Sequence, residues 1–262
     1  MSNMTNTEAD KFIPKLWSDD VVAEYKSRLV AASLVRNLSH AGKKGDSIYI
    51  PTPARVGANA KVAGQEVTLN TDTATNLTLS INEHWEWSMQ IEDLTKLQAL
   101  DSMRKFYTDQ AGYALASAVD NKIITDLSGA ATAATGATVE EKVLDGIETL
   151  NVADAPTVDR ALMVSPATYT ELLSNPRFSE ADKVGGNAIS TGNVGSIYGV
   201  TVYMTSAVAS GGILLQKEAL VLATQQSVRT QTQYKQEHLA DLFTADTVFG
   251  TLVARPGSIV SI

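Results

Sequence analysis

Apolar and polar residues alternate along much of the stretch from Gly42 to Glu86. In its second half, Leu77, Leu79 and Ile81 alternate with polar residues, which is the period-two pattern of a strand. The segment GDSIYIPTP at its start predicts a first strand. Residues Thr52 to Lys61, in contrast, offer almost no large apolar side chain to bury. The pattern therefore predicts a long two-stranded ribbon, a β-hairpin.

An isolated two-stranded ribbon is at best marginally stable in water, so this one needs another surface to lie on. The rest of the chain has no segment that is obviously spare to cover it. We therefore expect a neighbouring copy of the same protein to cover the ribbon. This expectation points to an assembly protein rather than a self-contained enzyme.

Apolar residues at spacings of three and four predict a long helix from Glu92 to Leu127. A second helix is expected from Asp19 to about Val30, with Ser18 as its N-cap. Two shorter helices have their own start signals: a Thr138/Glu141 capping box before Val139–Leu150, and Ser165-Pro166 before a helix that stops ahead of Pro176.

The second half of the chain contains several predicted strands. They are Ala161–Val164, Tyr198–Thr205, Gly212–Leu215 with Ala219–Ala223, Ser227–Tyr234 and Leu242–Val260. Small residues from Ser128 to Gly136 predict a hinge, and the Gly- and Ser-rich stretch from Ser179 to Ser196 predicts a mobile loop.

Composition narrows the possible functions. The chain has 262 residues, 44% of them hydrophobic, enough for one large domain or two. Its net charge of −8 argues against a dedicated nucleic-acid binder, and the absence of cysteine excludes thiolate metal sites and disulfides. The polar N-terminus has no secretory signal, and no apolar run approaches the roughly 20 residues of a membrane helix.

No group of residues in the sequence predicts a catalytic or metal site. His40, His84 and His238 lack metal-ligand spacing, so we expect surface or hydrogen-bonded histidines. Gly42–Asp46 lacks the spacing of a phosphate loop and is not followed by a helix, and Gly195–Gly199 does not match a nucleophile elbow. No cofactor is expected.

Two further features have competing interpretations. The acids Glu92, Asp93 and Asp101 could pair for acid–base chemistry, but acids in the first turn of a helix are the better interpretation. Trp85 and Trp87 could anchor a partner, or could close the core where the ribbon joins the long helix. These two interpretations of the tryptophans are compatible.

The order of these elements resembles that of the major capsid proteins of tailed phages, which have the Johnson fold of the Hong Kong 97 type. FIPKLWSDDVVAEYKSRLVAASLV followed by GDSIYIPTP resembles the arm and loop entry of that family. GSIYGVTVYMTSAV resembles its strand returning from the axial domain, and VFGTLVARPGSIVSI its final strand. The likeness covers essentially the whole chain.

The resemblance implies an α+β fold with an N-arm, a long β-hairpin extended loop, a spine helix, and peripheral and axial domains. The expected divisions are 1–41 for the arm, 42–86 for the extended loop, 87–137 for the peripheral domain with the spine helix, 138–210 for the axial domain, and 211–262 for strands that complete both domains.

The implied function is that of a coat protein forming pentamers and hexamers of an icosahedral head around double-stranded DNA. Partners would be further copies of the chain, a portal and, because only about ten residues precede the arm, a separate scaffolding protein; no membrane is expected, and assembly would take place in the host cytoplasm. The residues expected between subunits are Phe12, Trp17, Arg55, Lys61, Glu66, Trp85, Lys235 and Glu237.

Three other functions compete with this one. An encapsulin nanocompartment would share the fold but enclose protein cargo. An enzyme with an insertion loop would need a convergent polar site. A tail or sheath protein would also use extended arms but would form tubes.

Overall fold

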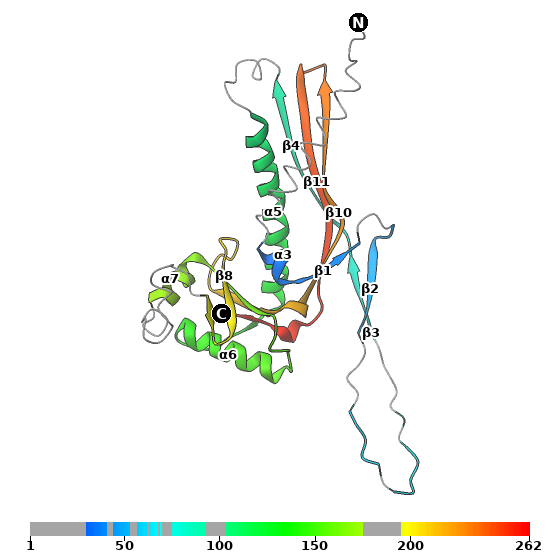
Figure 1. Cartoon of the computed structure of the whole chain (residues 1–262), viewed down its shortest axis with the longest axis vertical. Helices are drawn as coiled ribbons and strands as arrows, with labels where there is room; N and C mark the ends of the chain where they lie inside the picture. The colour runs from blue at the N-terminus through cyan, green and yellow to red at the C-terminus, as the bar shows by residue number, and fades with distance from the viewer. Residues whose placement is uncertain are drawn as a thin grey trace.

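The computed structural model describes residues 30–40, 44–52, 57–61, 63–67, 69, 75–92, 103–174 and 195–262. The described residues form an elongated body with a slender hairpin projecting from it (Figure 1). The predicted helix Asp19–Val30 lies outside this part of the chain, except for Val30 itself.

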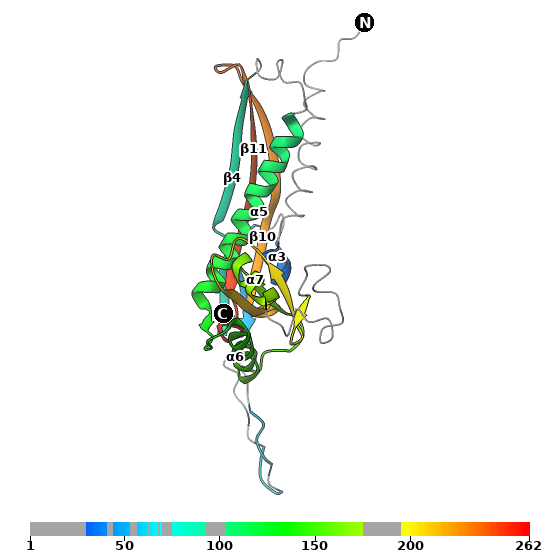
Figure 2. The same ribbon diagram turned by 90° about the vertical axis from the view of Figure 1, so that its left-hand side faces the viewer.

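The long axis of the body is formed by a sheet and one helix. The described strands of this sheet follow the order β1-β10-β11-β4. Their bounds are Arg36–Ser39, Leu220–Lys235, Ala240–Val253 and Glu83–Glu92. Helix α5, Met103–Ala130, runs along one face of the sheet (Figure 2). Its 28 residues span roughly 42 Å at about 1.5 Å each.

A second sheet lies beside the C-terminal half of α5 (Figure 1). Its order is β5-β12-β9-β6-β8-β7 among the described strands. Their bounds are Thr132–Ala133, Ile259–Ser261, Gly212–Gln216, Arg160–Val164, Val200–Met204 and Ser196–Ile197. Helices α6, Val139–Val152, and α7, Pro166–Ser174, cover one face, burying Val143, Leu150 and Leu172 against it.

One hydrophobic cluster joins the two sheets. It takes Val119, Ile123 and Leu127 from α5, Met163 and Ile213 from the second sheet, and Leu222 and Phe249 from the first. The chain passes between the sheets twice at this level, through the short 3-10 helices η1, Lys217–Ala219, and η2, Pro256–Ser258. The sheets therefore share one core rather than folding as separate layers.

Local sequence signals explain the starts of two helices. Thr138 and Glu141 form the predicted capping box of α6, with Glu141 N donating to Thr138 Oγ1 at 3.2 Å. Ser165 Oγ accepts from Thr168 N at 3.3 Å ahead of Pro166, so α7 also begins as expected.

The hairpin consists of β2, Ser47–Thr52, and β3, Thr75–Ser80, paired antiparallel. Its base packs on the sheet face opposite α5, because Leu79 and Ile81 join Val221, Ala223 and their neighbours in one cluster. Gly250 permits this close approach: a Cβ there would lie 2.3 Å from Ser80 O. The expectation that this chain has no surface for the ribbon was therefore wrong for its base.

Several predicted boundaries were also wrong. Glu92 ends strand β4 instead of starting the long helix, so its role as an acid in the first helical turn is excluded. The ladder of the hairpin ends at Ser80, and Glu83–Glu92 pairs with β11 instead. The expected hinge, Ser128–Gly136, begins inside α5, which ends at Ala130, and it also contains strand β5.

Three strand predictions also differ from the structure. Leu220–Lys235 is one bulged strand rather than two. The predicted strand Leu242–Val260 is divided by η2 into β11 and β12. A turn at Tyr198 and Gly199 separates β7 from β8.

Candidate assembly surfaces

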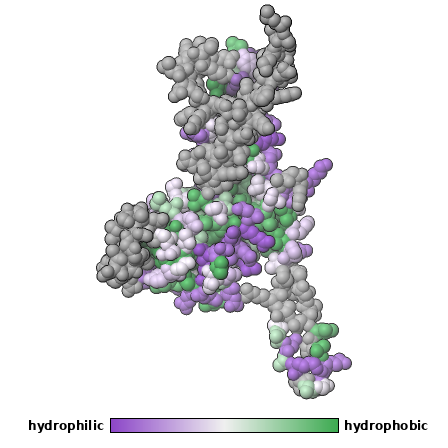
Figure 3. All heavy atoms as spheres, viewed as in Figure 1, coloured by the Kyte–Doolittle hydropathy of each residue, from purple (hydrophilic) through white to green (hydrophobic). Residues whose placement is uncertain are grey.

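The far end of the hairpin stands away from the body (Figure 1, Figure 3). Its described residues, 57–61, 63–67 and 69, are all exposed. Val67 and Leu69 are 64% and 86% exposed, although both are large and apolar. Lys61 and Glu66 lie here too, and Lys61 Nζ donates to the carbonyl of Gln65. The side chains of Val67 and Leu69 therefore form apolar surface that no other described part of the chain covers.

A groove between β4 and α5 is a second exposed apolar surface. Trp85 from β4 and Tyr113 from α5 line it, with side chains 43% and 53% exposed. Ala114 and Ala118 of α5 line the rest of the apolar part, and Gln110, Ser117 and Asn121 add polar groups. β4 pairs with β11 on one side only among the described strands. Exposed aromatic groups beside an open strand edge are features of docking surfaces.

Ion pairs border this groove at one end. Lys122 Nζ lies 3.3 Å from Glu83 Oε1 and 3.2 Å from Asp126 Oδ1. The hydrogen bond to Asp126 is the main reason that the pKa of Lys122 is raised. Trp85 Nε1 donates to Glu83 Oε2 at 3.2 Å, which fixes the indole at the rim. The border of the groove at Lys122 is thus charged, whereas Trp85, Tyr113, Ala114 and Ala118 give it an apolar part.

The turn between β10 and β11 is the third exposed feature. Lys235, which ends β10, is half-buried and pairs with Ala240. Glu237 is exposed in the turn, and Leu239 is 65% exposed with a φ of 45°. This turn and the hairpin lie at opposite ends of the molecule (Figure 1).

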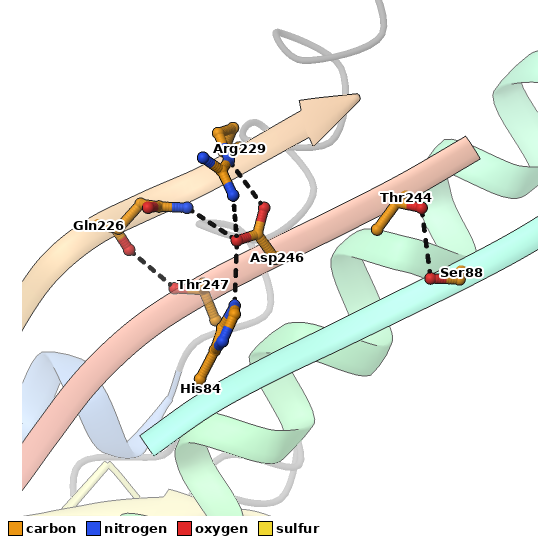
Figure 4. A network of polar contacts seen from close by, with 7 residues as sticks. All are labelled: His84, Ser88, Gln226, Arg229, Thr244, Asp246 and Thr247. Atoms are coloured by element: carbon orange, nitrogen blue, oxygen red, sulfur yellow. Dashed lines mark hydrogen bonds and ion pairs between the residues drawn. The ribbon is translucent and has the colours of Figure 1, made fainter. Parts of the chain in front are cut away.

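A polar network crosses the three strands β4, β11 and β10 (Figure 4). Its centre is the buried carboxylate of Asp246. Arg229 donates to both oxygens, at 3.1 and 2.9 Å, and Gln226 Nε2 donates at 2.9 Å. His84 Nε2 lies 3.1 Å from Oδ2. Burial acts to raise the pKa of Asp246, but these hydrogen bonds and the charge of Arg229 hold it below its ordinary value.

The predicted contact residues occupy three separate places. Lys61 and Glu66 lie at the far end of the hairpin, Trp85 in the groove, and Lys235 and Glu237 at the β10–β11 turn. Phe12, Trp17 and Arg55 lie outside the described residues. All eight stay predicted contact residues.

Trp85 and Trp87 differ in which of the two interpretations, partner anchor or core residue, each one fits. Trp87 packs on Phe243, with ring centroids 5.9 Å apart, beside Leu115 and Ala245. Trp87 thus belongs to the packing of the subunit, whereas Trp85 is the exposed member.

Sequence reasoning missed the residues around Asp246 and the buried Asp120 of α5. An acid within an otherwise apolar strand or helix stripe is the signal that could have identified them. Of the predicted histidines, His84 is a hydrogen-bonded surface residue, as expected.

Neither a metal cluster nor a membrane-spanning helix is found in the described part of the chain. No group of three or more His, Cys, Asp or Glu residues there could hold a metal ion. None of its helices is long and apolar enough to cross a membrane.

The sequence matches the family model described as phage capsid protein over residues 32–262. The chain belongs to the phage capsid protein family. This match confirms the predicted capsid function, implies a structural role, and places the protein in the virion capsid. A search of curated proteins gives no match.

Solved structures show the capsid fold. A chain of Mycobacterium phage Che8 is similar with a TM-score of 0.79 and 22% identity, covering 89% of this chain and 90% of that one. A chain from the asymmetric unit of the bacteriophage PhiM1 mature capsid gives 0.70 and 14%, covering 89% and 86%. A virus-like particle from Pyrococcus furiosus gives 0.67 and 11%, covering 96% and 99%.

The capsid protein therefore has the predicted α+β, Hong Kong 97-type fold. Fold similarity extends to phage capsids and to the virus-like particle alike, so it does not separate those two kinds of shell. The family match is what favours the phage major capsid protein over the encapsulin alternative.

Proposed function

We propose that copies of this capsid protein form pentamers and hexamers that close into an icosahedral head around double-stranded DNA. Assembly would take place in the host cytoplasm, with a separate scaffolding protein and a portal as partners. The net charge of −8 is compatible with non-specific enclosure of DNA, because an acidic shell would keep the packed polyanion from adhering to its wall. In this proposal the protein acts through interface area and performs no catalysis.

The observation that supports this proposal best is the contrast within the hairpin. Its base is fixed to the body through Leu79, Ile81 and the close approach at Gly250. Its far end exposes Val67 and Leu69. A rigidly mounted projection with an apolar end is suited to reaching a neighbouring subunit.

The groove beside Trp85 is our proposed receiving surface on that neighbour. Its apolar part suits Val67 and Leu69, and the two acids at its border, Glu83 and Asp126, share the single charge of Lys122, which leaves net negative charge that suits Lys61. Each such contact is modest, but every subunit in a closed shell makes several, so their sum is large and cooperative.

Deletion of Arg55–Thr71 tests the proposal. The six β2–β3 pairs from Ser47 to Thr52 stay intact, and Pro53, Ala54, Asp72, Thr73 and Ala74 can close the turn. We expect a folded subunit whose urea unfolding matches the full-length chain but which forms no closed shells by electron microscopy. Shells of normal size and stability from the deletion variant would refute the proposed role of the hairpin.

Images of purified full-length particles test the wider proposal. DNA-filled heads with rings of five and six subunits would support it. Small shells containing protein would favour a nanocompartment, and tubes would favour a tail or sheath protein.

A further inference from the structure

Helix α3, Ala31–Leu34, is a single short turn at the point where the chain passes from its first 29 residues into the body. Its N-cap residue is Val30, whose side chain has no oxygen to accept the free amide hydrogens of the first turn. An isolated turn of four residues is far too short to be stable by itself. Something else must hold α3 in place.

Asp120 supplies the missing acceptor from α5, 90 residues away in the sequence. Its Oδ2 accepts from Val30 N at 2.8 Å and its Oδ1 accepts from Ala32 N at 3.2 Å. Asp120 is only 6% exposed. At the other end of α3, Asn37 Nδ2 donates to Ala32 O at 2.8 Å. Side chains from outside the helix therefore bind both ends of α3.

The position of Asp120 is costly in electrostatic terms. Burial raises its pKa, and the backbone hydrogen bonds from Val30, Ala32 and Ala31 only partly oppose that change. A buried carboxylate that costs stability is retained in some proteins because it fixes one arrangement. Here it offers two acceptor oxygens to two amides, which no neutral side chain of the same size does.

We propose that Asp120 is a positioning residue that fixes the root of the N-terminal arm on the long helix. Ala31 and Ala32 pack in the core that joins both sheets, so the anchored turn has one orientation relative to α5. Val30, the first described residue, is thereby held at one place on α5. The inference rests on the proposed function, since the use of a fixed root is to bring the predicted arm to a neighbouring subunit.

Substitution of Asp120→Asn tests the anchor with little change of shape. The matched control is Asp109→Asn, on the same helix but 11 residues before Asp120, about three turns away and outside the groove. Hydrogen exchange is measured by mass spectrometry on the unassembled full-length chain. For Asp120→Asn we expect exchange of residues 30–34 to accelerate at least about tenfold, with residues 108–127 of α5 unchanged, and shell yield to fall at least about tenfold. Asp109→Asn should show neither effect.

Three results would overturn the proposal: unchanged exchange at residues 30–34, equal acceleration along α5, or normal shell yield despite loosened residues 30–34. If Asp120→Asn does not fold, hydrogen exchange of the wild-type chain still tests the anchor. The Val30 and Ala32 amides must then exchange as slowly as the amides in the middle of α5. Unprotected exchange at these two amides would refute the anchor. Failure of the wild-type chain to form shells even with its scaffolding protein present would refute the proposed function instead, because the exchange comparison uses unassembled subunits.

Discussion

At the scale of single residues, two buried carboxylates lie at the roots of the two segments expected to reach other subunits. Asp120 binds α3, and Asp246 binds His84 at the start of β4, just after the hairpin. Their pKa values move in opposite directions, because Asp120 has only backbone donors whereas Asp246 also has the charge of Arg229. The two roots therefore respond differently to pH.

Asp246→Asn should destabilise the subunit at pH 7 by about 1–3 kcal/mol, since it removes a charged acceptor of several hydrogen bonds. The pKa of Asp246 is depressed, so its contribution is present above the unfolded value of about 3.9 and is lost as the pH falls through the folded value. The difference from wild type should thus shrink below about pH 4 in urea titrations.

The control for this experiment is Asp159→Asn. Asp159 is exposed, and its φ of 57° suits asparagine. An equal loss of stability from Asp246→Asn at pH 3 and pH 7 would contradict the ionic role assigned to Asp246.

At the scale of elements, β4 contributes to two different surfaces. Its inner tryptophan, Trp87, packs on Phe243 under α5, and its outer one, Trp85, borders the open groove. Because both residues lie on the same strand, a comparison between them separates subunit packing from subunit contact.

Trp87→Ala should lower the free energy of unfolding of the subunit by about 2–4 kcal/mol, because it leaves a cavity beside Phe243. Trp85→Ala should cost less than about 1 kcal/mol in the subunit but should reduce shell yield strongly. Urea unfolding and light scattering measure the two effects. Normal shell yield from Trp85→Ala would exclude the groove as the receiving surface.

Sequence reasoning predicted elements whose signals are local. The alternation of Leu77, Leu79 and Ile81 and the Thr138/Glu141 capping box each act within a few residues, and both are present in the structure. It failed where a distant partner decides. Residue Glu92 joins β4 because β11 pairs with it, which no pattern near Glu92 records.

The candidate surfaces show the same limit. The hairpin was predicted because its alternation is visible in the sequence, but its mounting on Gly250 depends on a contact across 170 residues. The anchor at Asp120 joins residues 90 apart, and a single acid in a helical stripe gives no sign of its partner. Contacts between residues so far apart in the sequence can be found only in the tertiary structure.

At the scale of the whole molecule, the proposed function divides the chain into a body and two segments that contact neighbouring subunits, the hairpin and the predicted N-terminal arm. Phe12 and Trp17, at the start of the chain, stay predicted contact residues. Aromatic residues often dominate interface energies, so their effect should be visible in particles rather than in subunits.

The double variant Phe12→Ala and Trp17→Ala should lower the melting temperature of assembled particles more than that of unassembled subunits. Differential scanning calorimetry of both forms measures this difference. Trp87→Ala is the control, because a packing defect inside the subunit should lower both temperatures. Equal lowering by the double variant would assign Phe12 and Trp17 to the subunit core instead.

The two crossings between the sheets lie against each other: Ala254 N donates to Ala219 O at 2.8 Å, and Arg255 pairs with Glu218. With α5 packed across the same junction, the two halves of the body cannot rotate independently without breaking one shared core. We therefore expect the angle between neighbours in rings of five and of six to differ through bending of the hairpin beyond its fixed base. Shell curvature would then be set by how far this part of the hairpin flexes, while the body acts as a rigid tile.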